Sequence, residues 1–436
     1  MNASYEFAFF KPEQIANVDL VELRYQQSKQ LVHEKVVSSL DVATSEGFSD
    51  VELVEALRPF VNEIIVEEQI EISDEYQKRL LDELPEEMFG AGPLEKLLVD
   101  HEISDILVNH CHEVFVERNG ILERSNTIFA DNQHLMRVIQ RLVTHVGRSI
   151  DESNPLVDAR MEDGSRINAI IPPLALDGPK LSIRRFGNHK FDLVNLVDRN
   201  SLTGPIAEFL KAAVVARQSI LISGGTGSGK TTFLNALSSC IPSDQRIVTI
   251  EDSAELKLQH RHVARLETRP SGSDDVSEYD QRDLVRNALR MRPDRIIVGE
   301  VRGGEALDML QAMNTGHEGS LTTIHANDAL DAVARLEMMV AMTGIDLPIP
   351  VVRSYICSGI SIVVHLARLQ GGVRKVMRVS ELAESNGAYQ LNDLFEFRPN
   401  GIDENGKSVG DFFTLNQANC AKKFKEYGIS ITGSYS

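Results

Sequence analysis

The chain of 436 residues carries a formal net charge of −19 at pH 7, with 42% hydrophobic and 25% charged residues. This composition excludes extensive disorder, and the length predicts two or three domains. The four cysteines are far apart in sequence, which excludes a disulfide framework. Residues 1–100 hold 22 acidic and 8 basic side chains, so this part should repel nucleic acid and anionic lipid.

Three domains are predicted along the chain. Residues 1–88 have apolar positions at helical spacing and form an acidic helical domain. Residues 89–186 have the strand and helix pattern of a small mixed α/β domain. A polar linker over residues 187–200 follows, and residues 201–436 alternate strands and helices as a parallel nucleotide-binding sheet does, with a β-rich part near the end.

Expected strands in the middle domain cover residues 103–108, 114–117, 166–171 and 180–186, and Asn119-Gly120 is a predicted hairpin turn. Between the first two strands stand His110, Cys111 and His112. Their types are those of metal ligands, but three consecutive residues beside a hairpin are more typical of a loop. We interpret them as loop residues without a metal.

A complete phosphate-loop pattern, G-x-x-x-x-G-K-[ST], lies between a short apolar strand at residues 220–222 and a helix that begins near residue 232. Glycines let consecutive backbone N–H groups turn toward phosphates, the lysine adds positive charge near the β- and γ-phosphates, and the threonine hydroxyl is a ligand for Mg²⁺. The predicted ATP-binding residues are Gly224, Gly225, Thr226, Gly227, Ser228, Gly229, Lys230, Thr231 and Thr232.

Acidic side chains follow two further apolar strands, at the end where a parallel sheet presents its ligand crevice. Glu251 opens a cluster with Asp252 and Glu255, which could orient an attacking water or hold Mg²⁺ through water. Glu300 stands one residue after the position where a Walker B strand usually has aspartate, and it should approach the magnesium shell or the catalytic water. Arg302 could pair with Glu300 or touch phosphate.

His317 and His325 stand at the two ends of another expected strand, flanked by small residues that permit close backbone approach. No cysteine or aspartate lies at ligand spacing from them, so they are a weak metal signal. We expect them to sense the γ-phosphate or to bridge subunits.

Four arginines gather in a short span of the middle domain. If this domain packs over a phosphate loop, its own or a neighbour's, their guanidinium groups could neutralise charge that develops on the γ-phosphate. Salt bridges to local acids such as Asp158 and Asp163 are the alternative for some of them. The four are Arg160, Arg166, Arg184 and Arg185.

These motifs together resemble the type II/type IV secretion ATPase superfamily. The resemblance runs from about residue 90 to the end of the chain, and residues 157–168, 170–179 and 183–186 are most similar to the CpaF branch, the motors of tight-adherence (Tad) pili. The motifs that carry the superfamily resemblance are Gly-Gly-Thr-Gly-Ser-Gly-Lys-Thr-Thr232, Ile-Glu-Asp-Ser-Ala-Glu-Leu256, Ile-Ile-Val-Gly-Glu-Val-Arg302 and Gly-His-Glu-Gly-Ser-Leu-Thr-Thr-Ile-His-Ala-Asn327.

The resemblance implies an ATP- and Mg²⁺-dependent homohexameric ring, with a PAS-like α/β domain before a RecA-like ATPase domain and nucleotide between the two. It assigns Glu251 to the Asp box as the residue that polarises water, Glu300 to Walker B, and His317 and His325 to the His box. It also implies that arginines of the middle domain reach phosphate. The four-cysteine zinc insertion of type II secretion and pilus-extension motors is absent.

The expected function is a cytoplasmic motor at the inner membrane, working through a membrane platform protein without binding nucleic acid directly. We find no signal-peptide pattern and no apolar run long enough to span a bilayer. A motor for conjugative or effector transport and a nucleotide-gated scaffold remain as alternatives. A small-molecule kinase is disfavoured because no acceptor pocket is visible in the sequence.

Overall fold

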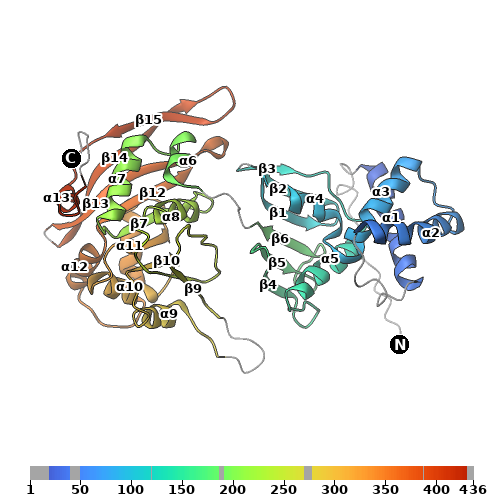
Figure 1. Ribbon diagram of the computed structural model, residues 1–436, viewed down its shortest axis with the longest axis horizontal. Helices are drawn as coiled ribbons and strands as arrows, with labels where there is room; N and C mark the ends of the chain where they lie inside the picture. Colours follow the sequence, from blue (N-terminus) through green and yellow to red (C-terminus); the bar gives the residue numbers. More distant parts are fainter. Residues whose placement is uncertain are drawn as a thin grey trace. The chain divides into compact units, whose positions relative to one another are not determined.

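The computed structural model describes residues 19–39, 50–118, 120–185, 191–269, 277–385 and 387–429 (Figure 1). The chain divides into two compact units, Met1–Asn188 and His189–Ser436. The predicted turn residue Asn119, Phe186 and most of the polar end of the tail lie outside the described residues. None of the helices in the described ranges combines the length and the apolar composition that a bilayer span requires.

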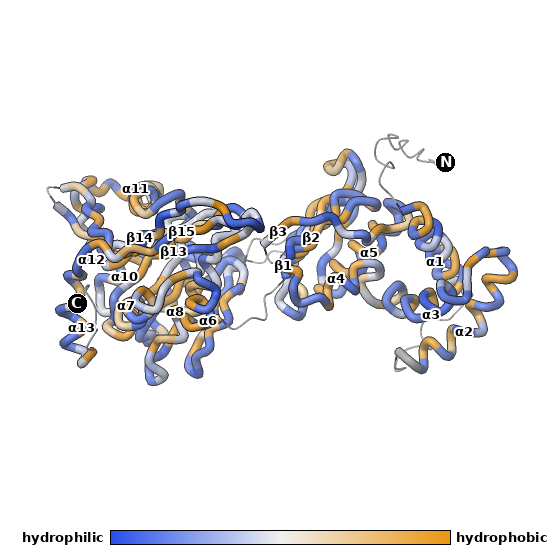
Figure 2. Tube along the Cα trace, turned by 90° about the horizontal axis from the view of Figure 1, so that it is seen from above, coloured by the Kyte–Doolittle hydropathy of each residue, from blue (hydrophilic) through white to orange (hydrophobic). Residues whose placement is uncertain are grey.

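The first unit begins with three helices, which appear as bands of alternating hydropathy in Figure 2. Their apolar residues, among them Leu57, Val61, Leu80 and Leu84, form one buried core. The third helix begins where Ser73 Oγ accepts a hydrogen bond from the Tyr76 amide, which satisfies a backbone donor that the helix leaves open. These helices are α1 (Leu20–Ser39), α2 (Asp50–Glu67) and α3 (Asp74–Phe89).

The second half of this unit is a six-stranded antiparallel sheet in the order β3-β2-β1-β6-β5-β4. Its apolar face packs on α5, which Asp131 caps by accepting a hydrogen bond from the His134 amide at 2.7 Å. The elements are η3 (Gly92–Leu94), α4 (Glu95–Val99), β1 (Ile103–His110), β2 (Glu113–Arg118), β3 (Ile121–Arg124), α5 (Asn132–His145), β4 (Leu156–Arg160), β5 (Arg166–Ile170) and β6 (Lys180–Arg184).

A buried ion cluster joins α1 and α3 to α5, the helix that packs on the sheet. Lys29 of α1, whose side chain is 2% exposed, lies 3.0 Å from Glu83 and 3.2 Å from Glu87 of α3. Glu87 also contacts His134 Nε2 of α5 at 2.6 Å. Burial alone would raise the pKa of Glu87, but the hydrogen bond from His134 and the charge of Lys29 outweigh it and lower this pKa to about 2.

The second unit is built on a nine-stranded sheet in the order β15-β14-β13-β12-β7-β11-β10-β8-β9. The six strands from β12 to β9 are parallel, and β13, β14 and β15 extend the sheet antiparallel. The strands are β7 (Ile220–Gly224), β8 (Ile247–Glu251), β9 (Val263–Glu267), β10 (Arg295–Val301), β11 (Leu321–His325), β12 (Ile362–Arg368), β13 (Arg374–Ser385), β14 (Ala388–Ile402) and β15 (Ser408–Thr414).

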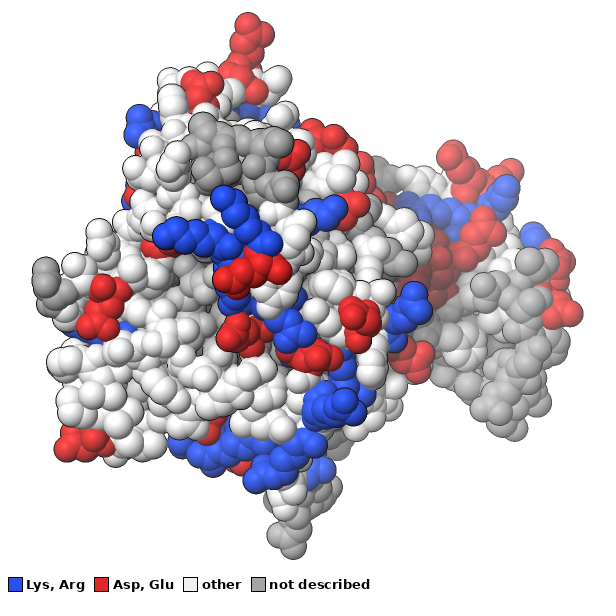
Figure 3. All heavy atoms as spheres, turned by 60° about the vertical axis from the view of Figure 1, so that its left-hand side comes forward, with Lys and Arg blue, Asp and Glu red and all other residues white. Residues whose placement is uncertain are grey.

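Helices cover both faces of this sheet. Neighbouring residues of β7 point to opposite faces and belong to two different hydrophobic cores. Ile220 and Ile222 of β7 pack in one core with the helices between residues 193 and 238. Leu221 packs in a second core with the helices between residues 281 and 359. The mixed α/β prediction is therefore confirmed. The helices are α6 (Leu193–Asp198), α7 (Gly204–Val215), α8 (Lys230–Ser238), α9 (Gln281–Ala288), α10 (Glu305–Asn314), α11 (Ala329–Ala341), α12 (Ile349–Gly359) and α13 (Ala421–Glu426), with the short η4 (Gln370–Gly372) between β12 and β13. On the face drawn in Figure 3, acidic and basic side chains are interspersed.

Replacing Lys29 should destabilise the first unit. Lys29→Ala leaves Glu83 and Glu87 buried without this cation, and we expect a loss of about 3–5 kcal/mol in the free energy of opening. Hydrogen exchange of peptides from α1 and α3 measures it. The control is Lys35→Ala, on the same helix as Lys29. Lys35 pairs with Glu68, and because this ion pair is more exposed than that of Lys29, its loss should leave the exchange nearly unchanged. Equal effects of the two substitutions would contradict the role of the buried cluster.

Candidate functional site

The phosphate loop lies between β7 and α8. All five residues of β7 are buried, and Gly229 enters α8 with φ of 93°, a left-handed conformation that favours glycine. The Ser228 hydroxyl donates a hydrogen bond to the Gly225 carbonyl at 2.8 Å, which closes the loop on itself. Backbone N–H groups at the start of α8 and the positive end of its dipole make this a site for anions.

Lys230 folds back over the loop. Its Nζ donates hydrogen bonds to the carbonyls of Gly224 at 2.9 Å and Gly225 at 3.1 Å, and lies 3.9 Å from Glu300 Oε1. Burial lowers the pKa of Lys230, against the opposing effect of Glu300. Phosphate oxygens would be stronger partners for this ammonium than two neutral carbonyls.

A chain of charges continues from Lys230 across the ends of the parallel strands. Arg302 donates from Nε to Glu300 Oε2 at 2.7 Å and pairs with the same carboxylate through Nη2. Its Nη1 lies 3.4 Å from Asp252 Oδ2. Of the two roles left open for Arg302, the structure shows the pairing with Glu300.

Glu251 at the end of β8 is 3% exposed. Its Oε1 accepts hydrogen bonds from the amides of Glu255 at 2.8 Å and Leu256 at 2.7 Å, while its Oε2 is buried with no hydrogen-bond partner among the described residues. Burial raises the pKa of Glu251 to about 7, although the two amides oppose it. A carboxylate poised near neutrality is suited to general-base chemistry.

Gly299 explains why the Walker B strand lacks its usual aspartate. A Cβ built on Gly299 would lie 3.0 Å from Cγ of Glu251, so a side chain at this position would displace the buried carboxylate. The next residue, Glu300, therefore supplies the acid at the tip of β10.

The register of β11 separates the two predicted histidines. His325 pairs with Gly224 of β7 and is exposed at the phosphate-loop edge. His317 precedes the first residue of β11, at the opposite end of this strand. Within the second unit, the structure brings His325 but not His317 to the phosphate loop.

Three of the four predicted arginines form a row in the first unit. Arg160 of β4 is opposite Arg166 of β5, which is opposite Arg184 of β6. Directly opposed residues share one face of a sheet, here the face away from the buried core residues. Asp158 lies 3.2 Å from Arg166, and Asp105 lies 3.2 Å from Arg184, so the predicted local salt bridges are present for these two arginines.

Arg185 differs from this row. Its Nη1 donates hydrogen bonds to the backbone carbonyls of Asp100 and Ile103, which ties the end of β6 to the segment before β1. Its contacts are those of a structural residue, and its predicted role at phosphate stays a prediction.

Two arginines that the motifs did not indicate lie at the phosphate loop. Arg374 Nε donates to the Gly227 carbonyl at 2.9 Å, and an Nη atom of Arg368 would lie 3.2 Å from a Cβ built on Gly227. They are opposite each other on β12 and β13. In the sequence, only Gly371-Gly372 indicates a tight turn between these two strands.

The residues present fit a magnesium-bound nucleoside triphosphate. The loop supplies anion-binding N–H groups and Lys230, and the partner-free oxygen of Glu251 lies at the same sheet edge. Thr231, in the first turn of α8, and Glu300 are the residues that would hold Mg²⁺, Glu300 directly or through water.

Comparisons with known proteins show the family of this chain. A family model described as "Type II/IV secretion system protein" matches residues 87–409. A protein of Mycobacterium tuberculosis, provisionally described as a conjugal transfer protein, is 38% identical over 313 residues, which cover 70% of this chain and 88% of that protein. The type IV secretion system protein VirB11 of Brucella suis is 32% identical over 305 residues, 64% of this chain and 84% of that one.

Among solved structures, the crystal structure of the VirB11 ATPase from the Brucella suis type IV secretion system in complex with sulphate is similar to this chain. The two are 31% identical, and the match covers 66% of this chain and 94% of that one with a TM-score of 0.36.

Two adjacent glycines of the loop should respond differently to alanine. A Cβ on Gly224 would lie 2.5 Å from the Leu366 carbonyl and from Ser228 Oγ, whereas a Cβ on Gly225 meets nothing within 4 Å. We expect Gly224→Ala to lose about 1–3 kcal/mol of stability and to weaken ATP binding strongly. Gly225→Ala is the matched control and should keep both. Calorimetric titration measures ATP binding, and thermal unfolding measures stability. Equal effects of the two substitutions on both quantities would contradict this loop geometry.

Proposed function

The chain belongs to the type II/IV secretion system protein family, and from this premise we propose that it is an ATP-hydrolysing motor of such a system. The observation that supports hydrolysis best is the buried carboxylate of Glu251, which keeps one oxygen without a partner among the described residues and has a pKa raised by burial to about 7. A nucleotide-gated scaffold that binds ATP without cycling would have no use for such a group.

Each residue of the site has a proposed task. Lys230 leaves the loop carbonyls and binds the β- and γ-phosphates. Glu251 accepts the proton of the attacking water through its buried oxygen. Arg302 orients Glu300, and Glu300 holds the metal shell together with Thr231. When bound, Mg²⁺ would supply positive charge that neutralises the charge developing on the phosphate oxygens.

Two substitutions separate binding from turnover. Lys230→Ala should lose ATP binding and hydrolysis, because the loop loses its cation. Glu300→Gln should keep binding and lower the turnover number by about 10²-fold or more. Phosphate release and binding of a fluorescent ATP analogue measure the two properties. Full hydrolysis by either variant would refute the assignment.

We further propose that residues 89–186 of the first unit serve as a PAS-like domain and residues 201–436 as a RecA-like domain, six copies forming a ring. The row of Arg160, Arg166 and Arg184 supports this proposal, because three cations on neighbouring strands attract an anion. In the ring, these guanidinium groups would reach the γ-phosphate and couple closure of the two domains to hydrolysis.

Removing one arginine of the row should slow hydrolysis more than it weakens binding. Arg184→Ala is expected to lower the turnover number by about 10³-fold, the effect of arginines that reach the transferring phosphoryl group in other nucleotide hydrolases. Arg118→Ala is the control, since Arg118 lies in the same sheet but pairs with Asp100, Glu102 and Glu123. Unchanged turnover in Arg184→Ala, measured at saturating ATP, would exclude the coupling.

The machine served is proposed to be a Tad-like pilus, on the motifs of residues 157–186, with the motor held at the cytoplasmic face of the inner membrane by a platform protein. Conjugative or effector transport is the second candidate, and the names of similar proteins favour it at least as much. Deleting the gene in its host decides between them: loss of surface pili with intact DNA or protein transfer supports the first, and the reverse result supports the second.

A further inference from the structure

The turn between β1 and β2 gathers three ligand-type side chains. His110, Cys111 and His112 are 9%, 0% and 8% exposed. One ligand atom from each lies within 4.8 Å of the others, and no other such group of three forms among the residues that the structure describes. The prediction that they are loop residues without a metal is not tested by this burial, but buried side chains are unusual for a turn beside a hairpin.

We propose that His110, Cys111 and His112 form a binding site for Zn²⁺. Two imidazoles and one thiolate are a nitrogen and sulfur set that suits this ion. Zinc–ligand bonds of about 2.0–2.3 Å place neighbouring ligand atoms about 3.5 Å apart, so the three side chains need to draw together by roughly 1 Å. Rotation about side-chain bonds can supply such a movement.

The backbone of the turn is held in place independently of a metal. The Phe129 amide donates to the Cys111 carbonyl at 2.7 Å, and Arg124 Nη2 donates to the His112 carbonyl at 3.3 Å. The His112 amide donates to His110 Nδ1 at 3.1 Å, which holds the His110 ring against the turn, and the centroids of the two imidazole rings lie 6.3 Å apart. When zinc binds His110, one ring nitrogen takes the ion and the other carries the proton. The hydrogen bond from the His112 amide is then lost, and the bond to zinc replaces it.

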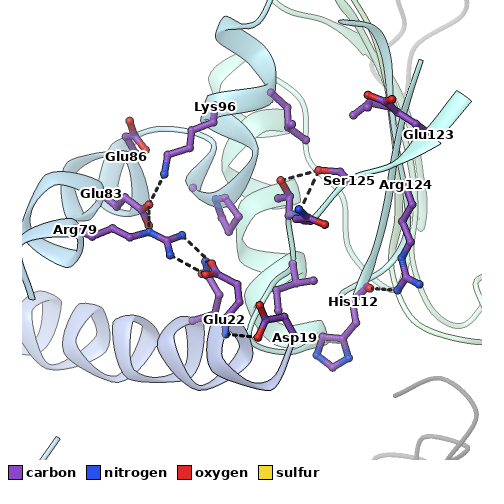
Figure 4. Close-up of a pocket in the computed structure, with 18 of the residues that line it drawn as sticks. Asp19, Glu22, Arg79, Glu83, Glu86, Lys96, His112, Glu123, Arg124 and Ser125 are labelled. Atoms are coloured by element: carbon purple, nitrogen blue, oxygen red, sulfur yellow. Dashed lines mark hydrogen bonds and ion pairs between the residues drawn. The ribbon is translucent and has the colours of Figure 1, made fainter. Parts of the chain in front are cut away.

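The surroundings of the turn offer a path for a metal ion and a side chain for its fourth ligand position. His112 lines a cavity of about 750 Å³ together with Lys96, Arg124 and Ser125 (Figure 4). A metal ion can therefore reach the turn from this cavity. On the other side, Glu113 Oε2 lies 3.9 Å from His110 Nε2, close enough for its carboxylate to fill the fourth position of a tetrahedral site. This site is separate from the nucleotide-binding edge and stands whether or not the proposed function holds.

Titration of the full chain with Co²⁺, a spectroscopic substitute for Zn²⁺, tests the proposal. The metal-free reduced protein should develop a thiolate-to-cobalt charge-transfer band and intense tetrahedral d–d bands, saturate at one ion per chain, and lose both when Zn²⁺ is added. Cys111→Ser should abolish the charge-transfer band, and His112→Gln should weaken binding by about tenfold or more. Cys357→Ser, which removes a half-buried thiol outside this turn, is the control and should bind as the wild type does.

A wild-type chain without the charge-transfer band, or a Cys111→Ser variant that keeps it, would overturn the proposal. If Cys111→Ser fails to fold in the absence of metal, X-ray absorption of the zinc-loaded wild-type chain decides instead. One sulfur and two imidazole ligands support the site, and a zinc shell without sulfur refutes it.

Discussion

The nucleotide site depends on the register of the strands around β7. Gly224, the last residue of β7, pairs with His325 on one side and with Leu366 on the other. A slip of one residue would turn every side chain of the strand to the opposite face. Because both faces of β7 are packed in separate hydrophobic cores, such a slip would disrupt both. The position of the phosphate loop is thus fixed by apolar packing, not by the polar groups that would bind phosphate.

Two buried carboxylates show how differently the two units use charge. Glu87 faces Lys29 and His134, and its pKa is lowered to about 2 although burial acts in the opposite direction. Glu251 has only two backbone amides as donors, and burial raises its pKa to about 7. A network with compensating cations stabilises the ionised form and holds helices together. A carboxylate whose burial outweighs its donors and nearby charges remains available to a proton or a ligand, which is the property that chemistry requires.

Much of the second unit could be predicted because its signals are local. Apolar runs bounded by polar residues predicted β8, which ends at Glu251, and β10, which ends one residue after Glu300, and parallel strands bring such ends to one edge. Arg374 could not be predicted, since a contact over 147 residues brings it to Gly227. The edge strand β4 was also missed: its exposed Leu156 and its charged residues break the alternation of apolar and polar positions that marks a half-buried strand.

The arginine row is the feature that the fold of the first unit explains least. Like charges directly opposite each other on neighbouring strands are destabilising, yet Arg160, Arg166 and Arg184 follow one another across three strands. Asp158 pairs with Arg166 and Asp105 pairs with Arg184, so nearby carboxylates offset part of this repulsion. Packing does not require the row, because the buried residues of these strands lie on the other face. The planar guanidinium groups are suited to the oxygens of a phosphate. Under the proposed function, a phosphate is the ligand that this row would bind.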